Sequence, residues 1–131
     1  MRSVHWLVIS TAALAVIVAG CAKKHDGDPG KQLQLITRSM LEIVKDNVGD
    51  CSKIVPALEQ FRKANEQKIK ELRKRDEELA KSLPPAEKTK YAEKMKQSMK
   101  ETYDMALSVI MEVNRKCPGQ ASKIADLLRM K

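Results

Sequence analysis

Three cysteines are the residues of this 131-residue chain whose chemistry is easiest to specify. Cys21 follows an apolar N-terminal segment, whereas Cys51 and Cys117 lie far apart in the charged remainder. A thiol can be acylated, oxidised to a disulfide, bind a soft metal or act as a nucleophile. The choice among these depends on the compartment and on the elements that place each thiol.

Residues for other kinds of catalysis are scarce. The two histidines, His5 and His25, both precede the region expected to fold, which therefore lacks an imidazole for general-base or metal-binding duty. The sequence has no CxxCH haem motif, no glycine-rich phosphate loop and no nucleophile elbow. We therefore expect a protein that is not an enzyme and that has no cofactor.

A group of methionines gives the one candidate for metal binding. Met95, Met99, Met105 and Met111 lie within one expected helix, and thioethers are suitable ligands for cuprous copper. Only Met95 and Met99 share a helix face, and both lie on the stripe expected to pack against another helix. Because methionine commonly fills gaps in narrow cores, we expect packing here and no metal site.

The composition favours an all-α fold. Hydrophobic residues make up 43% of the chain and charged residues 32%, but aromatic residues only 3%. A core with so few large rings must rely on aliphatic side chains, which suits helices that pack along stripes. The length allows one domain.

The N-terminus has the features of an export signal. Arg2 precedes an apolar run, and small residues then lead to Cys21 in the motif VAGC at residues 18–21. This motif resembles the lipobox of bacterial lipoproteins. The resemblance implies removal of the signal peptide 1–20 and attachment of fatty acyl chains such as palmitate to Cys21. Two alternatives remain open: a chance match, and an uncleaved anchor, for which residues 4–20 are barely long enough to span about 30 Å of hydrocarbon.

Lipidation would place the mature chain on a membrane surface in the cell envelope. Two or more acyl chains give a stable anchor in the lipid bilayer, and residues 21–30 are polar enough to act as a tether with a reach of roughly 17 Å. Ala22 stands where an aspartate would signal inner-membrane retention in the enterobacterial pattern, so we expect the periplasmic face of the outer membrane. Such a location makes nucleic acid an improbable partner.

Helix breakers divide residues 31–131, which we expect to form a single helical domain. Asp28-Pro29 is a suitable helix start, Gly49 a suitable helix end, and Pro84-Pro85 a break between two long apolar patterns. We expect helices over about residues 29–48, 52–82, 85–116 and 120–130. The two long helices should form an antiparallel hairpin, and the third follows a heptad pattern typical of coiled coils.

The hairpin brings the two remaining cysteines together. With the turn centred on Pro84, Cys51 and Cys117 occupy facing positions at the open end. An exported chain occupies an oxidising compartment, and removal of Cys21 from the count leaves an even number of thiols. We therefore predict a disulfide that clamps the hairpin, with two unrelated buried thiols as the alternative.

The same pairing places Asp76 beside Ala92, one residue from Tyr91, and Asn65 beside Tyr103. Polar groups on an apolar stripe usually fix helix register by hydrogen bonding, which we prefer here to a ligand site.

Positive charge is concentrated in the half of the hairpin that contains the turn. The chain carries a formal net charge of +8, and most of the excess lies between Arg62 and Lys100. Many of these charges are spaced as ordinary helical pairs on a solvated face. The remainder could attract an acidic protein surface or an anionic envelope polymer. The candidate partner-binding residues are Arg62, Lys70, Arg73, Lys74, Arg75, Lys88, Lys90, Lys94 and Lys96.

These expectations favour an interaction protein of the cell envelope. A lipid-tethered adaptor or accessory subunit is broadly similar in size and anchoring to the pilotins, although no motif matches a particular family. A periplasmic helical chaperone and a self-associating structural spacer, a homodimer for example, are the alternatives. We also expect the clamped end of the hairpin to lie near the bilayer and the basic turn to point away from it.

Overall fold

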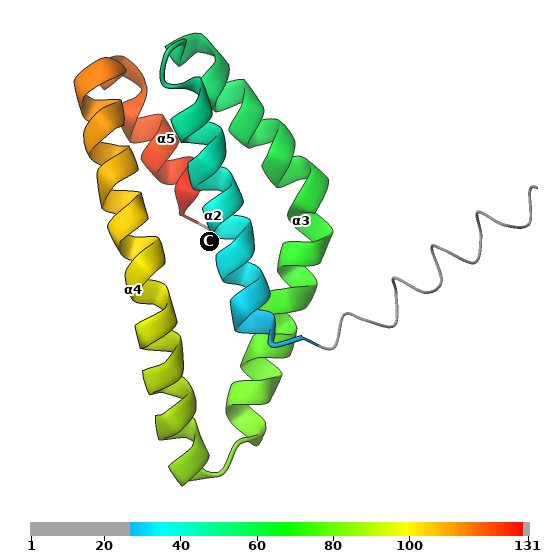
Figure 1. The fold of residues 1–131 in the computed structure, drawn as a ribbon. Helices are drawn as coiled ribbons and strands as arrows, with labels where there is room; N and C mark the ends of the chain where they lie inside the picture. Colours follow the sequence, from blue (N-terminus) through cyan, green and yellow to red (C-terminus); the bar gives the residue numbers. More distant parts are fainter. Residues whose placement is uncertain (1–26, 130–131) are drawn as a thin grey trace, which may run out of the picture.

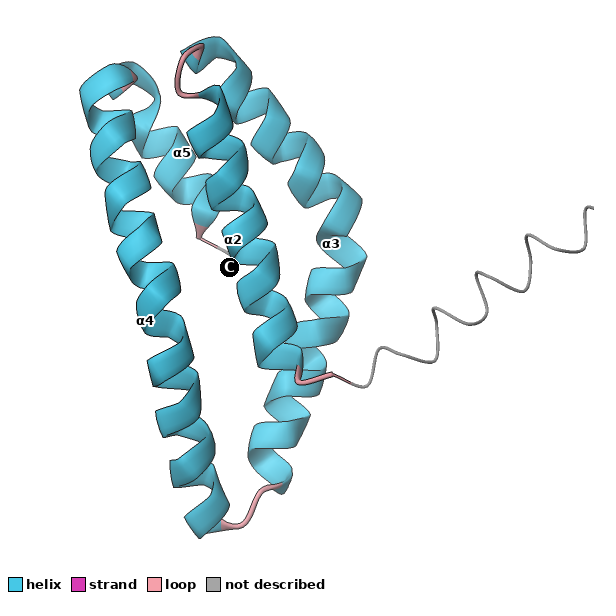
Figure 2. Cartoon of the chain, in the orientation of Figure 1, coloured by secondary structure: helices cyan, strands magenta, loops and turns pink. Residues whose placement is uncertain are grey.

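The computed structural model describes residues 27–129, and all regular structure in this range is helical (Figures 1 and 2). Helices α2 (Pro29–Asn47), α3 (Cys51–Ser82), α4 (Pro85–Lys116) and α5 (Ala121–Leu128) follow one another, with a 3-10 turn (Pro118–Gln120) before α5. This architecture confirms the predicted all-α fold, in which a long antiparallel hairpin is accompanied by a shorter helix at each end. The expected signal peptide and Cys21 lie outside the described residues.

The helix boundaries follow from local chemistry. The side chain of Asp28 accepts a hydrogen bond from the backbone N–H of Gly30 at 3.0 Å, and Asp50 accepts one from Ser52 at 3.2 Å, so both carboxylates cap helix N-termini. Leu83 has an extended backbone, as the following proline requires, and Pro85 occupies the first turn of α4.

Helix α2 lies between α3 and α4 and packs against both of them (Figure 1). Helix α5 packs against α3 and α4 behind α2. Side chains from all four helices form the main core: Met40, Leu41, Val44, Val48, Ile54, Val55, Leu58, Val109, Val113, Cys117 and Ile124. The short helices therefore cover much of the apolar surface of the two long ones.

A disulfide joins the first residue of α3 to the residue that follows α4. The sulfur atoms of Cys51 and Cys117 are 1.99 Å apart, and their Cα atoms are 5.6 Å apart. The predicted clamp is confirmed. The hairpin is thus closed covalently at both ends, by the peptide chain at the turn and by the cystine at the opposite end.

The described chain enters the bundle at the turn end. Helix α2 runs back along α3 for 19 residues, which is about 28 Å, so its start lies far from the disulfide (Figure 1). Asp28 lies 3.3 Å from the hydroxyl of Tyr91 and shares a surface cleft with Leu79 and Ser82 at the end of α3. The start of α2 therefore lies at the turn end and not at the clamped end, because α2 reverses direction against α3. This placement does not support the expectation that the clamped end lies nearest an N-terminal anchor.

The first turn of α2 is also part of the folded domain. Pro29 and Gly30, which the expected tether 21–30 contains, are both buried. A Cβ atom on Gly30 would lie 2.5 Å from the terminal methyl carbon of Met95, so α2 and α4 approach closely here. None of the helices among residues 27–129 has a stretch that is long and apolar enough to cross a membrane.

Candidate functional site

A polar junction joins three helices where α2 begins. The hydroxyl of Tyr91 on α4 donates to Oδ1 of Asp76 on α3 at 2.6 Å, and Oδ1 of Asp28 lies 3.3 Å away. Burial, followed by the two nearby carboxylates, raises the pKa of Tyr91 well above its ordinary value of about 10. The phenol therefore stays protonated and acts as a structural hydrogen-bond donor. Its partner Asp76 thus meets Tyr91, one residue from the predicted neighbour Ala92.

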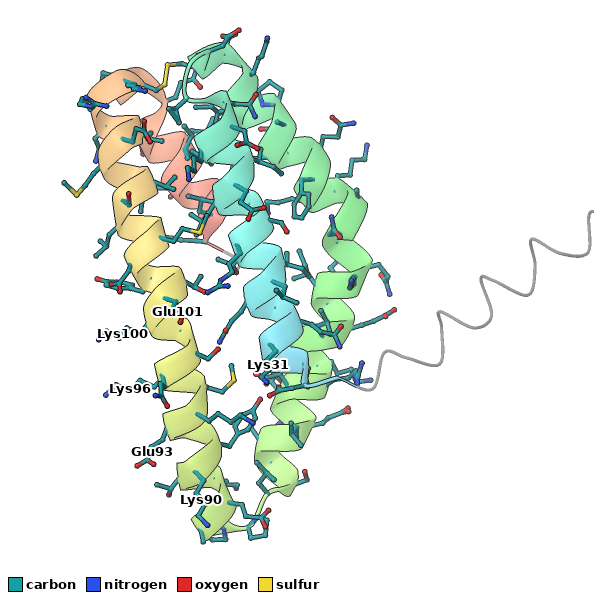
Figure 3. The ribbon with its side chains drawn as sticks, viewed as in Figure 1. Lys31, Lys90, Glu93, Lys96, Lys100 and Glu101 are labelled. Atoms are coloured by element: carbon teal, nitrogen blue, oxygen red, sulfur yellow. A yellow bond between two sulfur atoms is a disulfide. The ribbon has the colours of Figure 1, made fainter. Side chains whose placement is uncertain are left out.

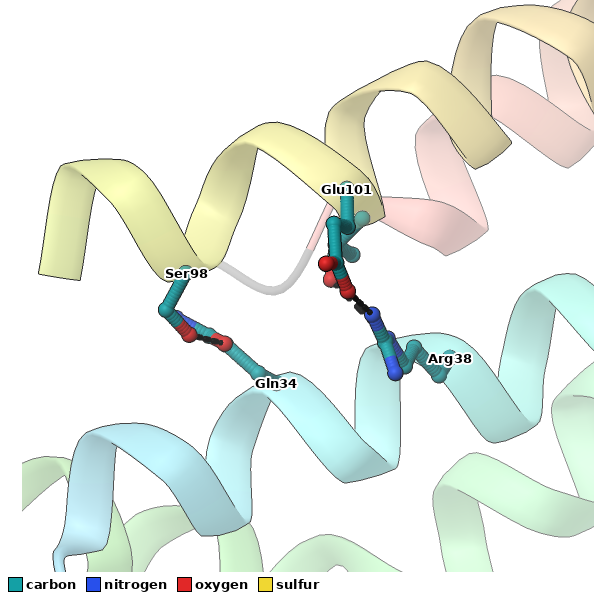
Figure 4. A network of polar contacts seen from close by, with 5 residues as sticks. Gln34, Arg38, Ser98 and Glu101 are labelled. Atoms are coloured by element: carbon teal, nitrogen blue, oxygen red, sulfur yellow. Dashed lines mark hydrogen bonds and ion pairs between the residues drawn. The ribbon is translucent and has the colours of Figure 1, made fainter.

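A second polar seam joins α2 to α4 (Figure 4). The Arg38 guanidinium forms an ion pair with Glu101 at 2.8 Å, and its Nε donates to the hydroxyl of Thr102 at 3.3 Å. One turn earlier, the Ser98 hydroxyl donates to the Gln34 side-chain oxygen. These contacts fix the register of α4 against α2, and the open cleft beside them has no nucleophile paired with a base.

The second predicted polar pair is not observed. The Asn65 side chain donates to the carbonyl of Phe61 on its own helix at 2.8 Å, and the Tyr103 side chain is 63% exposed. The reason is the position of α2, which lies between the two long helices and meets Thr102 through Arg38.

The predicted basic residues do not form one surface. Arg62, Lys70 and Arg73 border a cleft between α3 and the end of α5 at Leu127. Lys94 borders the cleft beside Arg38, Lys96 borders a cleft along α4, and Arg75 borders clefts at the junction of α2 and α3. The others, Lys74, Lys88 and Lys90, are exposed. The excess of basic over acidic residues between Arg62 and Lys100 is thus spread around both long helices.

Within residues 27–129, no group of three or more histidine, cysteine, aspartate or glutamate side chains could hold a metal ion. The methionines of α4 divide between two environments. Met95 and Met105 are half-buried, whereas Met99 and Met111 are 55% and 71% exposed. The expectation that Met99 packs against α3 is therefore wrong, since α2 occupies that position.

An exposed apolar ridge on α4 is the most unusual surface feature. Four of the five large hydrophobic side chains that are exposed between residues 27 and 129 lie on α4, each four residues from the next. They are Met99, Tyr103, Leu107 and Met111, which we call the α4 ridge. Residues spaced by four form a ridge on a helix surface, and such ridges pack into the grooves of another helix.

The N-terminal half of this ridge forms one wall of a shallow apolar cleft. The cleft has a volume of about 820 Å³, and its apolar lining comes from Ala92, Met95, Met99 and Tyr103. The polar residues at its border are Glu93, Lys96, Gln97 and Lys100. Figure 3 shows Lys96 and Lys100 extending away from the bundle on the outer side of α4. The cleft therefore combines an apolar lining with a charged border.

Comparison with protein-family models, curated proteins and solved structures found no match to this chain. The sequence did contain a signal for the ridge that the heptad reading missed. The heptad pattern assigns Met99 to the buried stripe. Met99 also belongs to a second series of large apolar residues at intervals of four, with Tyr103, Leu107 and Met111, and this regular spacing indicates one helix face.

Proposed function

We propose that this chain is a membrane-tethered lipoprotein that acts as a non-enzymatic interaction protein of the cell envelope. The supporting observation is the Cys51–Cys117 disulfide, which leaves Cys21 as the one unassigned thiol directly after a lipobox-like motif. Stable disulfides are typical of exported proteins, and the lipobox resemblance gives Cys21 a separate chemical role.

The point at which the chain enters the bundle gives the proposed anchor a direction. Only residues 22–26 separate Cys21 from Gly27, where the described chain begins, and the six residue steps from Cys21 to Gly27 span at most about 21 Å. A lipid on Cys21 would therefore hold the turn end of the hairpin, with Lys88 and Lys90, close to the bilayer. In this proposal the basic turn faces the membrane and its anionic lipids, where each nearby basic side chain contributes about 1 kcal/mol of attraction.

The test of this proposal is the covalent state of the mature protein. Intact-mass spectrometry should find a chain that begins at Cys21 and carries fatty acyl groups, and Cys21→Ser should abolish both the cleavage and the acylation. The matched control is the double variant Cys51→Ala/Cys117→Ala, which should still be acylated. A mature chain that retains residues 1–20, or a Cys21→Ser variant that is still acylated, would contradict the proposal.

The α4 ridge also favours a second candidate, a periplasmic helical chaperone that shields apolar segments of unfolded clients. Crosslinking in cells followed by mass spectrometry separates the candidates. An adaptor should give one dominant partner, a chaperone many clients, and a self-associating spacer only its own chain. We favour the adaptor because the apolar surface is a narrow ridge with a defined spacing.

A further inference from the structure

We infer that the α4 ridge is the interface of a symmetric homodimer, in which the α4 helices of two copies pack antiparallel about Tyr103. Such a dimer goes beyond the proposed function, because it gives the interaction protein a quaternary structure. It stands on the folded domain alone and does not require the lipid on Cys21.

The apolar residues of α4 are arranged symmetrically about Tyr103. Met95 extends the α4 ridge by one more interval of four, so large apolar side chains stand at residues 95, 99, 103, 107 and 111. In an antiparallel pair centred on Tyr103, each residue meets the one equally far on the other side of the centre. Met99 of each copy then meets Leu107 of the other, and Met95 meets Met111. A surface that is complementary to itself under a twofold axis is what a closed dimer requires.

The cleft beside the ridge lies where the second copy's ridge ends. Its apolar lining comes from Ala92, Met95, Met99 and Tyr103. The antiparallel pair places Met111 of the second copy over Met95, at this cleft. Met111 is 71% exposed in one copy and Met95 is half-buried. Pairing therefore removes a very exposed apolar side chain from water, and methionine adapts readily to such a contact.

The charges next to Tyr103 are complementary in the same register. Lys100 and Asp104 lie on one flank of the ridge, one turn apart, and both are exposed. The antiparallel pair brings Asp104 of each copy beside Lys100 of the other, offset by about 3 Å along the helix axes. The two aspartates then lie between the two lysines, so the four charges balance. Opposite charges placed in this way favour one relative direction of the two helices.

Both of these charged side chains are available to a second copy. In the described part of the chain, no ion pair within 4.0 Å involves Lys100 or Asp104. A lysine four residues before an acidic residue is the weaker order for a pair on one helix, which agrees with this finding. Figure 3 shows Lys100 extending away from the bundle.

Lys96 also fits the interface, although it lies close to the ridge. In the antiparallel pair it meets Ile110 of the second copy, which is half-buried within its own chain. The long apolar stem of a lysine can cover such a residue while its ammonium group stays in water at the rim.

A parallel pairing of the same ridges is less favourable. In a parallel twofold pair, opposite flanks of the two helices meet. Lys100 of one copy would then lie beside the apolar Met99 of the other and away from Asp104. The lysine would lose water without gaining an acidic partner, which is unfavourable.

The test is disulfide crosslinking of the full-length protein in the cells that make it. Cells that make both Met99→Cys and Leu107→Cys should give a crosslinked dimer after mild oxidation, because these positions face each other. Either variant made alone should give at least about fivefold less, because the two copies of one residue lie about 12 Å apart along the helix axes. Leu35→Cys is the matched control for random collision, since Leu35 is 61% exposed on α2 and off the ridge.

Charge reversal in both crosslinking variants then tests the register. Lys100→Glu or Asp104→Lys should each lower the yield of the mixed pair by about threefold or more, because like charges then lie side by side. The two reversals together restore the opposite charges and should return the yield to within about twofold. One helix pair is a small interface, so the dimer should dissociate in dilute solution, where each reversal variant should unfold at about the same temperature as the unaltered protein.

Three results would overturn the dimer: equal yields from Met99→Cys alone and from the mixed pair, a yield from Leu35→Cys as high as that of the mixed pair, or no recovery with the double reversal. A dominant crosslink from the ridge to a different protein would also overturn it. Yields are read from whole-cell extracts and do not depend on acylation of Cys21, so failure of the dimer and failure of the proposed anchor are distinguishable. If the dimer is also an adaptor, crosslinking in cells should give the chain itself in addition to one dominant partner.

Discussion

Asp28, the residue that caps α2, lies 3.3 Å from the hydroxyl of Tyr91 on α4. The same hydroxyl donates to Asp76 on α3 at 2.6 Å, so one phenol connects the entry point of the chain to both long helices. The junction fixes which end of the bundle the N-terminal segment leaves. This hydrogen-bond network thus joins the start of α2 to both long helices at the turn end of the bundle.

Replacement of Tyr91 by phenylalanine should destabilise the fold by about 1 to 2 kcal/mol. The substitution keeps the ring but leaves the half-buried Asp76 without its donor, and hydrogen bonds to charged groups contribute more than neutral ones. Urea unfolding followed by circular dichroism measures the change. Tyr103→Phe is the matched control and should alter the unfolding free energy by less than about 0.5 kcal/mol, because Tyr103 is exposed. Equal effects of the two substitutions would show that the junction contributes nothing.

The free energy of unfolding should fall as the pH rises above 10. The folded state raises the pKa of Tyr91, so it holds the phenolic proton more tightly than the unfolded chain does. The stabilisation from this proton is complete below pH 10 and is lost as the pH rises above 10 toward the folded-state pKa. In Tyr103→Phe, Tyr91 is the only tyrosine, and tyrosinate absorbance should appear together with loss of helical circular dichroism. Ionisation near pH 10 with the helices intact would contradict this prediction.

Loss of the disulfide should cost about 4 kcal/mol in the chain-entropy account, given 66 residues of sequence separation between its cysteines. Reduction of the protein, or Cys51→Ala/Cys117→Ala, should lower the urea midpoint correspondingly. Thiol labelling of the unfolded, unreduced protein supplies the control, since Cys51 and Cys117 should not react. If either cysteine is labelled without reduction, the clamp is absent in solution.

Two methionines provide a comparison between the core and the surface. Met40→Ala should destabilise the protein by about 2 to 5 kcal/mol, because its side chain is fully buried between helices and its removal leaves a cavity. Met111→Ala removes the same atoms from the exposed ridge and should cost less than about 0.5 kcal/mol. Thermal unfolding measures both. A large loss with Met111→Ala would mean that the ridge is covered in the folded protein.

Much of the secondary structure could be predicted because its signals are local. Asp28 and Asp50 are side chains that satisfy free backbone N–H groups, and Pro85 fits only the first turn of a helix, so the helix starts follow from neighbouring residues. The disulfide could also be predicted, because two long helices joined by a tight turn leave one geometric pairing for Cys51 and Cys117.

The arrangement of the helices could not be predicted in the same way. An apolar stripe on α3 or α4 tells which face is buried but not which helix covers it. The heptad pattern of α4 favours direct packing on α3, whereas α2 lies between the two helices in the structure. The predicted pairing of Asn65 with Tyr103 and the predicted burial of Met99 are wrong for this reason. The sequence also does not indicate at which end of the bundle α2 begins, because the antiparallel packing of α2 on α3 depends on tertiary contacts and not on local signals.

The covalent ring formed by α3, the turn, α4 and the cystine determines how the domain would respond to a mechanical load. If the N-terminus is fixed to a membrane and a partner pulls on α4, tension enters through the start of α2. The cystine holds the open ends of α3 and α4 together, so these ends cannot be drawn apart while it is intact. The first event under force is then the peeling of α2 from between them, which begins at Asp28 and breaks the contact with Tyr91.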